Sequence, residues 1–151
     1  LLVGVITKSV SDEIKPSINS DEDYEEFCRI NSENDKRRAL SKFITSLLNC
    51  DVIQSDFVLV ILEKLVNDFN NLIETENMTS SCDEISENLK IIIENSKDIF
   101  NKTNDDDEKN KWTEIVDKIK IISKMKTTDY KSFSKKTLFR FYDIMDKLNK
   151  K

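Results

Sequence analysis

The chain has only one glycine, Gly4, and one proline, Pro16, in 151 residues. A sheet needs turns between its strands, and most tight turns need glycine or proline. A chain with so few of these residues is poorly suited to a sheet. We therefore predict an all-α fold, and the length fits one domain with a substantial hydrophobic core.

Apolar residues recur at helical spacing in five successive segments. The five stripes are Leu40, Phe43, Ile44, Leu47 and Leu48; Val58, Ile61, Leu62, Leu65, Phe69, Leu72 and Ile73; Ile85, Leu89, Ile92, Ile93, Ile99 and Phe100; Trp112, Ile115, Val116, Ile119 and Ile122; and Leu138, Phe141, Met145 and Leu148. Ser55 is expected to cap the second helix, and Ser81 to Glu84 has the pattern of a capping box before the third. Short polar connectors favour antiparallel neighbours. We predict an α-solenoid of antiparallel helix pairs, with a closed four-helix bundle as the alternative.

The first 35 residues are expected to differ from the rest. Residues 1–14 would finish a helix that begins upstream, and residues 15–35 would form an acidic linker or a short helix before the helical repeats of 36–151. The opening Leu1-Leu2-Val3 has neither an initiator methionine nor a charged region. This indicates a segment of a longer protein rather than a signal peptide. No apolar run approaches the roughly 20 residues of a membrane span.

The composition argues against an enzyme. The chain has no histidine, which removes the commonest general base and the usual zinc partner. It also has no glycine-rich phosphate loop. The acidic run Asp105 to Glu108 lacks the alternating ligands and central glycine of a calcium loop. We expect no catalytic residues, no metal and no cofactor.

The three cysteines, Cys28, Cys50 and Cys82, are odd in number and widely spaced. A disulfide framework would be even and denser, so we expect a reducing, cytoplasmic compartment and three small core fillers.

Charge is distributed unevenly along the chain. Residues 109–151 hold 13 basic and 5 acidic residues, a net charge of +8, whereas residues 1–108 hold 11 and 24, a net charge of −13. The two parts add to the net charge of −5 for the whole chain. Such a basic end can bind RNA phosphates weakly and without sequence preference. The candidate lysines are Lys118, Lys120, Lys124 and Lys126, and the alternative is a plain solvated face.

Two segments resemble a known family. The stretch KRRALSKFITSLLN, residues 36–49, resembles a helix of the middle domain of eukaryotic translation initiation factor 4-gamma, with Lys42, Phe43, Ile44 and Leu47 matching directly. The closing stretch from Ser134 resembles the last helix of that domain, with Phe139, Asp143 and Asp146 in register. Leu138 and Thr137 depart from the family pattern. The resemblance covers the C-terminal part of such a domain, as in a divergent or viral member.

The resemblance implies a stack of HEAT-type helical repeats without catalysis. It implies a scaffold in translation initiation that binds and activates a DEAD-box RNA helicase, with RNA contact through basic faces. A cap-binding protein would bind through regions outside this sequence. Related middle domains act in splicing and mRNA decay, so those pathways are alternatives. A rival from another class is a helical interaction bundle with an apolar peptide groove, such as a viral apoptosis inhibitor.

Three aromatic residues occur within four positions of the last predicted helix. With Leu138 at 0° and about 100° per residue, Phe141 falls near 300° and Tyr142 near 40°, on one core stripe with Met145 and Leu148. Phe139 falls near 100°, off that stripe. It either packs beneath a neighbouring element or contacts a partner. The resemblance places Phe139 at the end of the stack that meets the helicase, and the partner-binding residues expected there are Phe139, Arg140, Asp143, Asp146 and Lys136.

Overall fold

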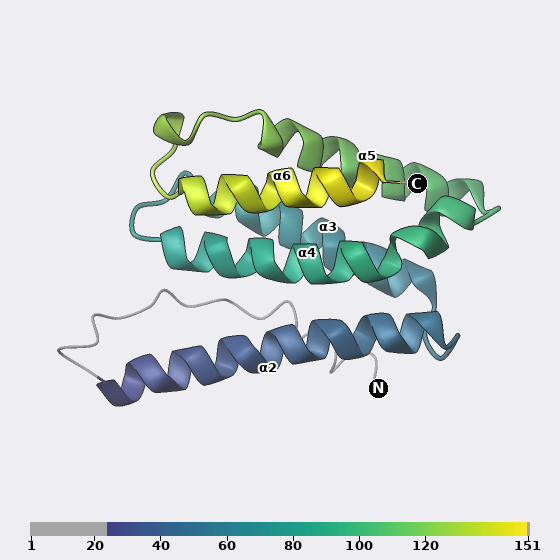
Figure 1. The fold of residues 1–151 in the computed structure, drawn as a ribbon, viewed down its shortest axis with the longest axis horizontal. Coiled ribbons are helices and arrows are strands. Elements are labelled where there is room, and N and C mark those ends of the chain that lie inside the picture. The colour runs from purple at the N-terminus through teal and green to yellow at the C-terminus, as the bar shows by residue number, and fades with distance from the viewer. Residues whose placement is uncertain (1–23, 151) are drawn as a thin grey trace.

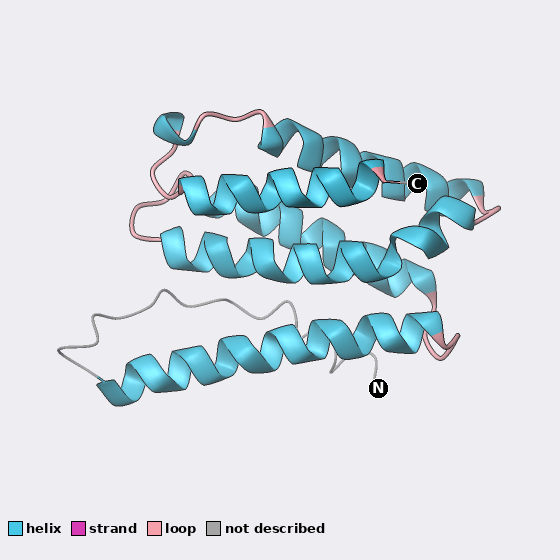
Figure 2. Cartoon of the chain, viewed as in Figure 1, coloured by secondary structure: helices cyan, strands magenta, loops and turns pink. Residues whose placement is uncertain are grey.

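The computed structural model describes residues 24–150, and every regular element within that range is helical, as Figure 2 shows. The helices are α2 (Tyr24–Asn49), α3 (Ser55–Leu72), α4 (Thr79–Lys102), α5 (Asp106–Ser123) and α6 (Lys135–Asn149), with a short 3-10 helix, η1 (Thr127–Asp129), before α6. The all-α prediction is therefore confirmed over these residues. The helix expected at residues 1–14 and the start of the expected linker lie outside the described residues.

The helices form two layers (Figure 1). Helices α2, α4 and α6 lie side by side in one layer and run in the same direction, while α3 and α5 lie behind them and run the opposite way. Helix α4 is central and contacts α2, α3, α5 and α6. The contacts also close a ring of α3, α4, α6 and α5, with α2 packed outside that ring. Consecutive helices are thus antiparallel, as the short connectors predict.

The hydrophobic core lies mainly between α3, α4, α5 and α6. Phe69 of α3 is fully buried, and its ring lies 4.9 Å from that of Phe141 on α6 and 5.6 Å from that of Phe133. Phe100 of α4 stacks on Trp112 of α5 with ring centroids 4.7 Å apart. Of the cysteines, Cys82 fills the core as predicted, whereas Cys28 and Cys50 are exposed, so the prediction of three core fillers is wrong for those two.

Helix α2 is longer than the sequence pattern indicated. It begins at Tyr24 and continues through Lys36, so residues 24–35 are neither a linker nor a separate short helix. Arg29 pairs with Glu26 and Glu33 along the helix surface, and pairs at these spacings stabilise an isolated helical segment. Acidic residues in the first turn also suit the helix dipole.

The buried face of α2 also differs from the predicted stripe. Phe43, expected in the core, is exposed, and the buried residues of this part of the helix are Ser41, Ile44, Thr45 and Leu48. The reason is that the buried face of α2 includes the polar Ser41 and Thr45 as well as Ile44 and Leu48, so it does not coincide with the apolar stripe. The Ser41 hydroxyl donates to Asn88 Oδ1 at 2.7 Å, and the Asn49 side-chain amide donates to the Asn95 carbonyl at 2.9 Å.

Two predicted helix starts are wrong. Ser55 is the first residue of α3 rather than its cap, and its hydroxyl donates to the Glu108 carboxylate. Helix α4 begins at Thr79, so Ser81 and Glu84 lie inside the helix, where both are buried. Glu84 pairs with Arg38 of α2 instead of closing a capping box. A buried carboxylate needs such a charged partner, and this requirement explains its place in the helix better than capping does.

Candidate partner-binding surface

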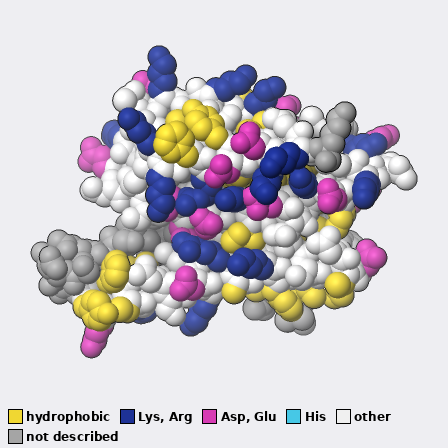
Figure 3. Space-filling view, viewed as in Figure 1, with side chains coloured by type: hydrophobic (Ala, Val, Ile, Leu, Met, Phe, Trp, Pro, Cys, Tyr) yellow, Lys and Arg dark blue, Asp and Glu magenta, His cyan; other side chains and the backbone are white. Residues whose placement is uncertain are grey.

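Phe139 and Tyr142 form an exposed aromatic pair on α6. The Phe139 side chain is 58% exposed and that of Tyr142 is 44% exposed, and their ring centroids lie 5.9 Å apart. Asp143 and Asp146 are exposed on the same side of the helix. We call the surface made by Phe139, Tyr142, Asp143 and Asp146 the α6 face. Figure 3 shows a hydrophobic patch over the first half of α6, surrounded by charged side chains.

The way α6 sits in the molecule explains this exposure. Ser134 is the N-cap and accepts a hydrogen bond from the Thr137 N–H at 3.1 Å, which fixes where the helix begins. The buried residues of α6 are Thr137, Phe141 and Ile144. On the projection that puts Leu138 at 0°, these three cluster near 270°, and Phe139 lies about 170° from them. Phe139 is therefore outside the core, as predicted.

Tyr142 was expected on the core stripe, and this expectation is wrong. The true buried face is centred on Thr137, Phe141 and Ile144, so Leu138 lies at its edge and is only half-buried. Tyr142 lies about 130° from the centre of that face and emerges into solvent. The stripe omitted Ile144, which the structure buries completely. The threonine and isoleucine together would have shifted the predicted centre.

Arg140 does not present its guanidinium to a partner. Its side chain is 14% exposed and pairs with Asp83 and Glu87 of α4. Lys136 also reaches Asp83, with Nζ 3.5 Å from a carboxylate oxygen, and Asp143 lies 4.0 Å from Lys90 Nζ. Of the expected partner-binding set, Phe139, Asp143 and Asp146 share the α6 face. Arg140 points towards α4, whereas the Lys136 side chain is 73% exposed and only its ammonium group approaches Asp83.

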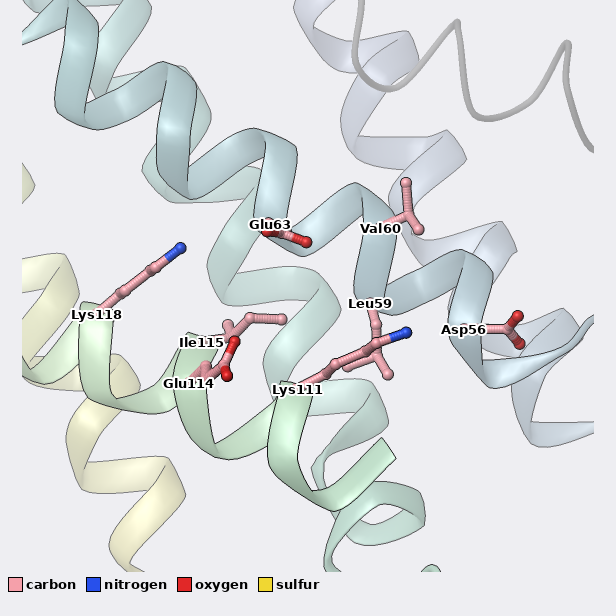
Figure 4. A pocket seen from close by; sticks show the side chains of 8 residues that line it. All are labelled: Asp56, Leu59, Val60, Glu63, Lys111, Glu114, Ile115 and Lys118. Carbon is pink, nitrogen blue, oxygen red and sulfur yellow. The ribbon is translucent and has the colours of Figure 1, made fainter. Parts of the chain in front are cut away.

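The four candidate RNA-binding lysines do not form one patch. Lys120, Lys124 and Lys126 are exposed at the C-terminal end of α5 and just beyond it. Lys118 is half-buried and lines a crevice of about 40 Å³ between α3 and α5. Figure 4 shows Lys118 and Lys111 extending from α5 towards α3, whose Glu63 also lines this crevice. Since residues two apart on a helix differ by about 200°, Lys118 and Lys120 face different sides.

The acidic run is part of a helix start. Asp105 is the N-cap of α5 and its carboxylate accepts hydrogen bonds from the N–H groups of Asp107 and Glu108, at 2.9 and 3.2 Å. A cleft of about 600 Å³ adjoins this turn and carries four carboxylates, those of Asp51, Asp56, Asp105 and Glu108. Among residues 24–150, no group of three or more metal-ligating side chains is placed to hold an ion.

Sequence reasoning missed the acidic turn of α4, which contains Asp83, Glu84 and Glu87. The spacing of Ser81 and Glu84 suggested a capping box, and nothing in the pattern predicted that arginines from two different helices would reach these acids. Glu84 lies about 100° from Ile85 on the helix, outside the apolar stripe, so the stripe gave no signal for its burial.

Within the described residues no helix is both long and apolar enough to cross a membrane. No family model, curated protein or solved structure matches this chain.

Proposed function

We propose that this chain is a non-enzymatic scaffold that binds and activates a DEAD-box RNA helicase in the cytoplasm. The observation that carries the proposal is the exposed pair Phe139 and Tyr142, with carboxylates on the same face. A large aromatic side chain surrounded by polar groups is the usual composition of an interface hot spot. We infer the partner and the pathway from the resemblance of residues 36–49 and of the segment from Ser134 to an initiation factor 4-gamma middle domain.

The two-layer order of the helices fits a stack of HEAT-type pairs, and the ring of α3, α4, α6 and α5 fits the closed four-helix bundle. In such a stack the first helices of successive pairs lie in one layer and the second helices lie in the other. Helices α2, α4 and α6 against α3 and α5 have this order. The α6 face is then the end surface of the stack, where a partner can dock without displacing a neighbouring helix. Splicing or decay remains the alternative pathway for the same kind of scaffold.

The rival proposal, a bundle with an apolar peptide groove, has less support. An amphipathic peptide helix needs an apolar groove to bury its own apolar face. The larger cleft described here, at about 600 Å³, carries four carboxylates along its lining. Leu48, Ile53 and Ile99 also line it, but its negative charge suits an apolar peptide poorly.

Phe139→Ala tests the proposal. Phe139 contributes little to the core, so we expect the melting temperature to stay within a few degrees of the wild type. Affinity for a purified initiation-type DEAD-box helicase should fall about 30-fold, which corresponds to a hot-spot loss of about 2 kcal/mol. Isothermal titration calorimetry measures the affinity, and circular dichroism measures the melting temperature.

Two variants serve as controls. Val60 on α3 is 54% exposed, nearly as much as Phe139, but lies away from α6, so Val60→Ala should leave helicase binding unchanged. Phe141→Ala removes a fully buried ring and should cost about 3–5 kcal/mol of unfolding free energy. Absence of helicase binding by the wild-type protein, or equal losses from Phe139→Ala and Val60→Ala, would rule the proposal out.

A further inference from the structure

The first turns of α4 carry three acids that face two different neighbours. Glu84 faces α2, where Arg38 Nε donates to its carboxylate at 2.7 Å. The hydrogen bond to Glu84 raises the pKa of Arg38, and the nearby charges of Glu84 and Glu87 add to the effect. Asp83, the preceding residue, faces α6 instead. Figure 3 shows charged side chains of both signs across the face where α6 meets the first half of α4.

Asp83 contacts three residues in the first turns of α6. The Thr137 hydroxyl donates to Asp83 Oδ1 at 3.3 Å, and Lys136 Nζ lies 3.5 Å from Oδ2. The Arg140 guanidinium donates to the Asp83 carboxylate and, at 3.2 Å, to the Asp83 backbone carbonyl. The Asp83 carboxylate thus joins the N-terminal turns of α6 to α4.

Arg140 completes this contact with further bonds to α4. Its Nη1 donates to the Ser86 hydroxyl at 2.9 Å, and its Nε lies 2.8 Å from a Glu87 carboxylate oxygen. A guanidinium is planar and presents its donors in a fixed fork, so several acceptors on one helix define its orientation. Because Arg140 directly follows Phe139 in the same helix, an Arg140 fixed against α4 also fixes the direction in which Phe139 points.

We propose that Asp83 is a positioning residue for the α6 face, acting through Arg140 to set the rotation of α6 about its axis. This inference rests on the proposed function in that it assigns the α6 face to partner binding, but the position of α6 can be measured without a partner. Asp83 holds Phe139 and Tyr142 outward, and Arg140 serves the same purpose rather than contacting the partner itself.

Fluorine NMR on protein labelled with 3-fluorotyrosine tests the positioning role directly. The chain has three tyrosines, Tyr24, Tyr130 and Tyr142, and the Tyr142→Phe variant assigns the resonance at the α6 face. Phe139→Ala calibrates how strongly this resonance responds, since the two rings are neighbours. We expect Asp83→Asn to shift or broaden the Tyr142 resonance and to leave that of Tyr24 unchanged. Helicase affinity should fall about tenfold in the same variant.

Glu84→Gln is the matched control. It alters the adjacent acid on the same turn and breaks the contact with α2 but not the contact with α6, so the Tyr142 resonance should stay in place. Glu87→Gln neutralises the acid that contacts Arg140 Nε and leaves Asp83 in place, so it should give a smaller change in the same direction as Asp83→Asn. It serves as the test if Asp83→Asn folds poorly. An unchanged Tyr142 resonance in both Asp83→Asn and Glu87→Gln, or an equal change in Glu84→Gln, would overturn the positioning role. A shifted resonance in a protein that binds no helicase would support the positioning role and refute the proposed function.

Discussion

Cys82 illustrates how burial controls the chemistry of a single residue. Its side chain has no exposed surface, and burial, with a smaller contribution from the charge of Asp83, raises the thiol pKa to about 12. At pH 8 only about one Cys82 in ten thousand would be a thiolate, the reactive form. We expect Ellman's reagent to label the two exposed thiols, Cys28 and Cys50, quickly in the native protein and the third only in denaturant.

A Cys82→Ser variant should give two reactive thiols in both conditions. Fast reaction of all three thiols in the native wild type would contradict the burial of Cys82. The raised thiol pKa also makes the stability of the protein depend on pH. Because the folded-state pKa is raised, the folded state favours the protonated thiol, so its contribution to stability is present below the ordinary value near 9 and is lost between about pH 9 and 12.

Helical geometry alone predicted the position of Phe139 but not that of Tyr142. Phe139 is so far from any apolar stripe that an error of some tens of degrees does not change its exposure. Tyr142 lay near the edge of the predicted stripe. Whether its side chain is buried or exposed therefore depended on whether the centre of the buried face is closer to Leu138 or to Ile144. Which of the two lies at the centre is set by contacts with α4 and α5, and these are properties of the packed molecule.

Among the helices, α5 has the best-defined start. Asp105 accepts two backbone hydrogen bonds as the N-cap. We expect Asp105→Ala to lower the unfolding free energy by about 1 kcal/mol, within the range of about 0.5–2 kcal/mol found for such caps. Urea denaturation followed by circular dichroism measures it, with the m-value unchanged. Asp106→Ala, one residue into the helix, should cost only a few tenths of a kcal/mol through the helix dipole. Equal effects of the two variants would show that Asp105 acts by charge rather than as a cap.

The residues at which the helices begin were the hardest feature to predict from the sequence. The sequence contains two capping patterns, at Ser55 and at Ser81 to Glu84, and in both cases the side chain bonds to a different helix instead. Local rules describe what a serine or glutamate does for its own helix. They do not include the arginine or glutamate that another helix places beside it. The N-terminal half of α2 was missed for a related reason, since its polar surface gives no apolar stripe to detect.

At the scale of the whole molecule, the number of core helices followed from the apolar periods, but their layering did not. Each stripe shows that a helix has a buried face. It does not identify the helix that covers this face, and α4 contacts four others. The buried face of α2 combines Ser41 and Thr45 with Ile44 and Leu48, so hydrophobic periodicity alone did not locate this face.

The charge distribution of the whole molecule leads to a prediction about RNA. Lys124 and Lys126 are exposed just beyond the C-terminal end of α5, whereas Lys118 lies in the crevice that Glu63 and Asp56 also line. A lysine whose ammonium group lies among carboxylates binds a phosphate poorly, because the negative charges of the carboxylates repel the phosphate. If the basic end binds RNA backbone, Lys124→Glu with Lys126→Glu should lower affinity for a single-stranded RNA about tenfold, and Lys118→Glu should change it little.

The salt dependence of binding distinguishes phosphate contacts from other effects of these substitutions. Each lost contact with a single-stranded phosphate lowers the slope of log K against log salt concentration by about 0.7, so the double variant should lose about 1.4. Fluorescence anisotropy with labelled RNA of two unrelated sequences, from low to moderate salt, measures slope and sequence preference together. A double variant with the wild-type slope would show that these lysines are solvated surface. An effect of Lys118→Glu as large as that of the double variant would place the RNA on the α3–α5 side instead.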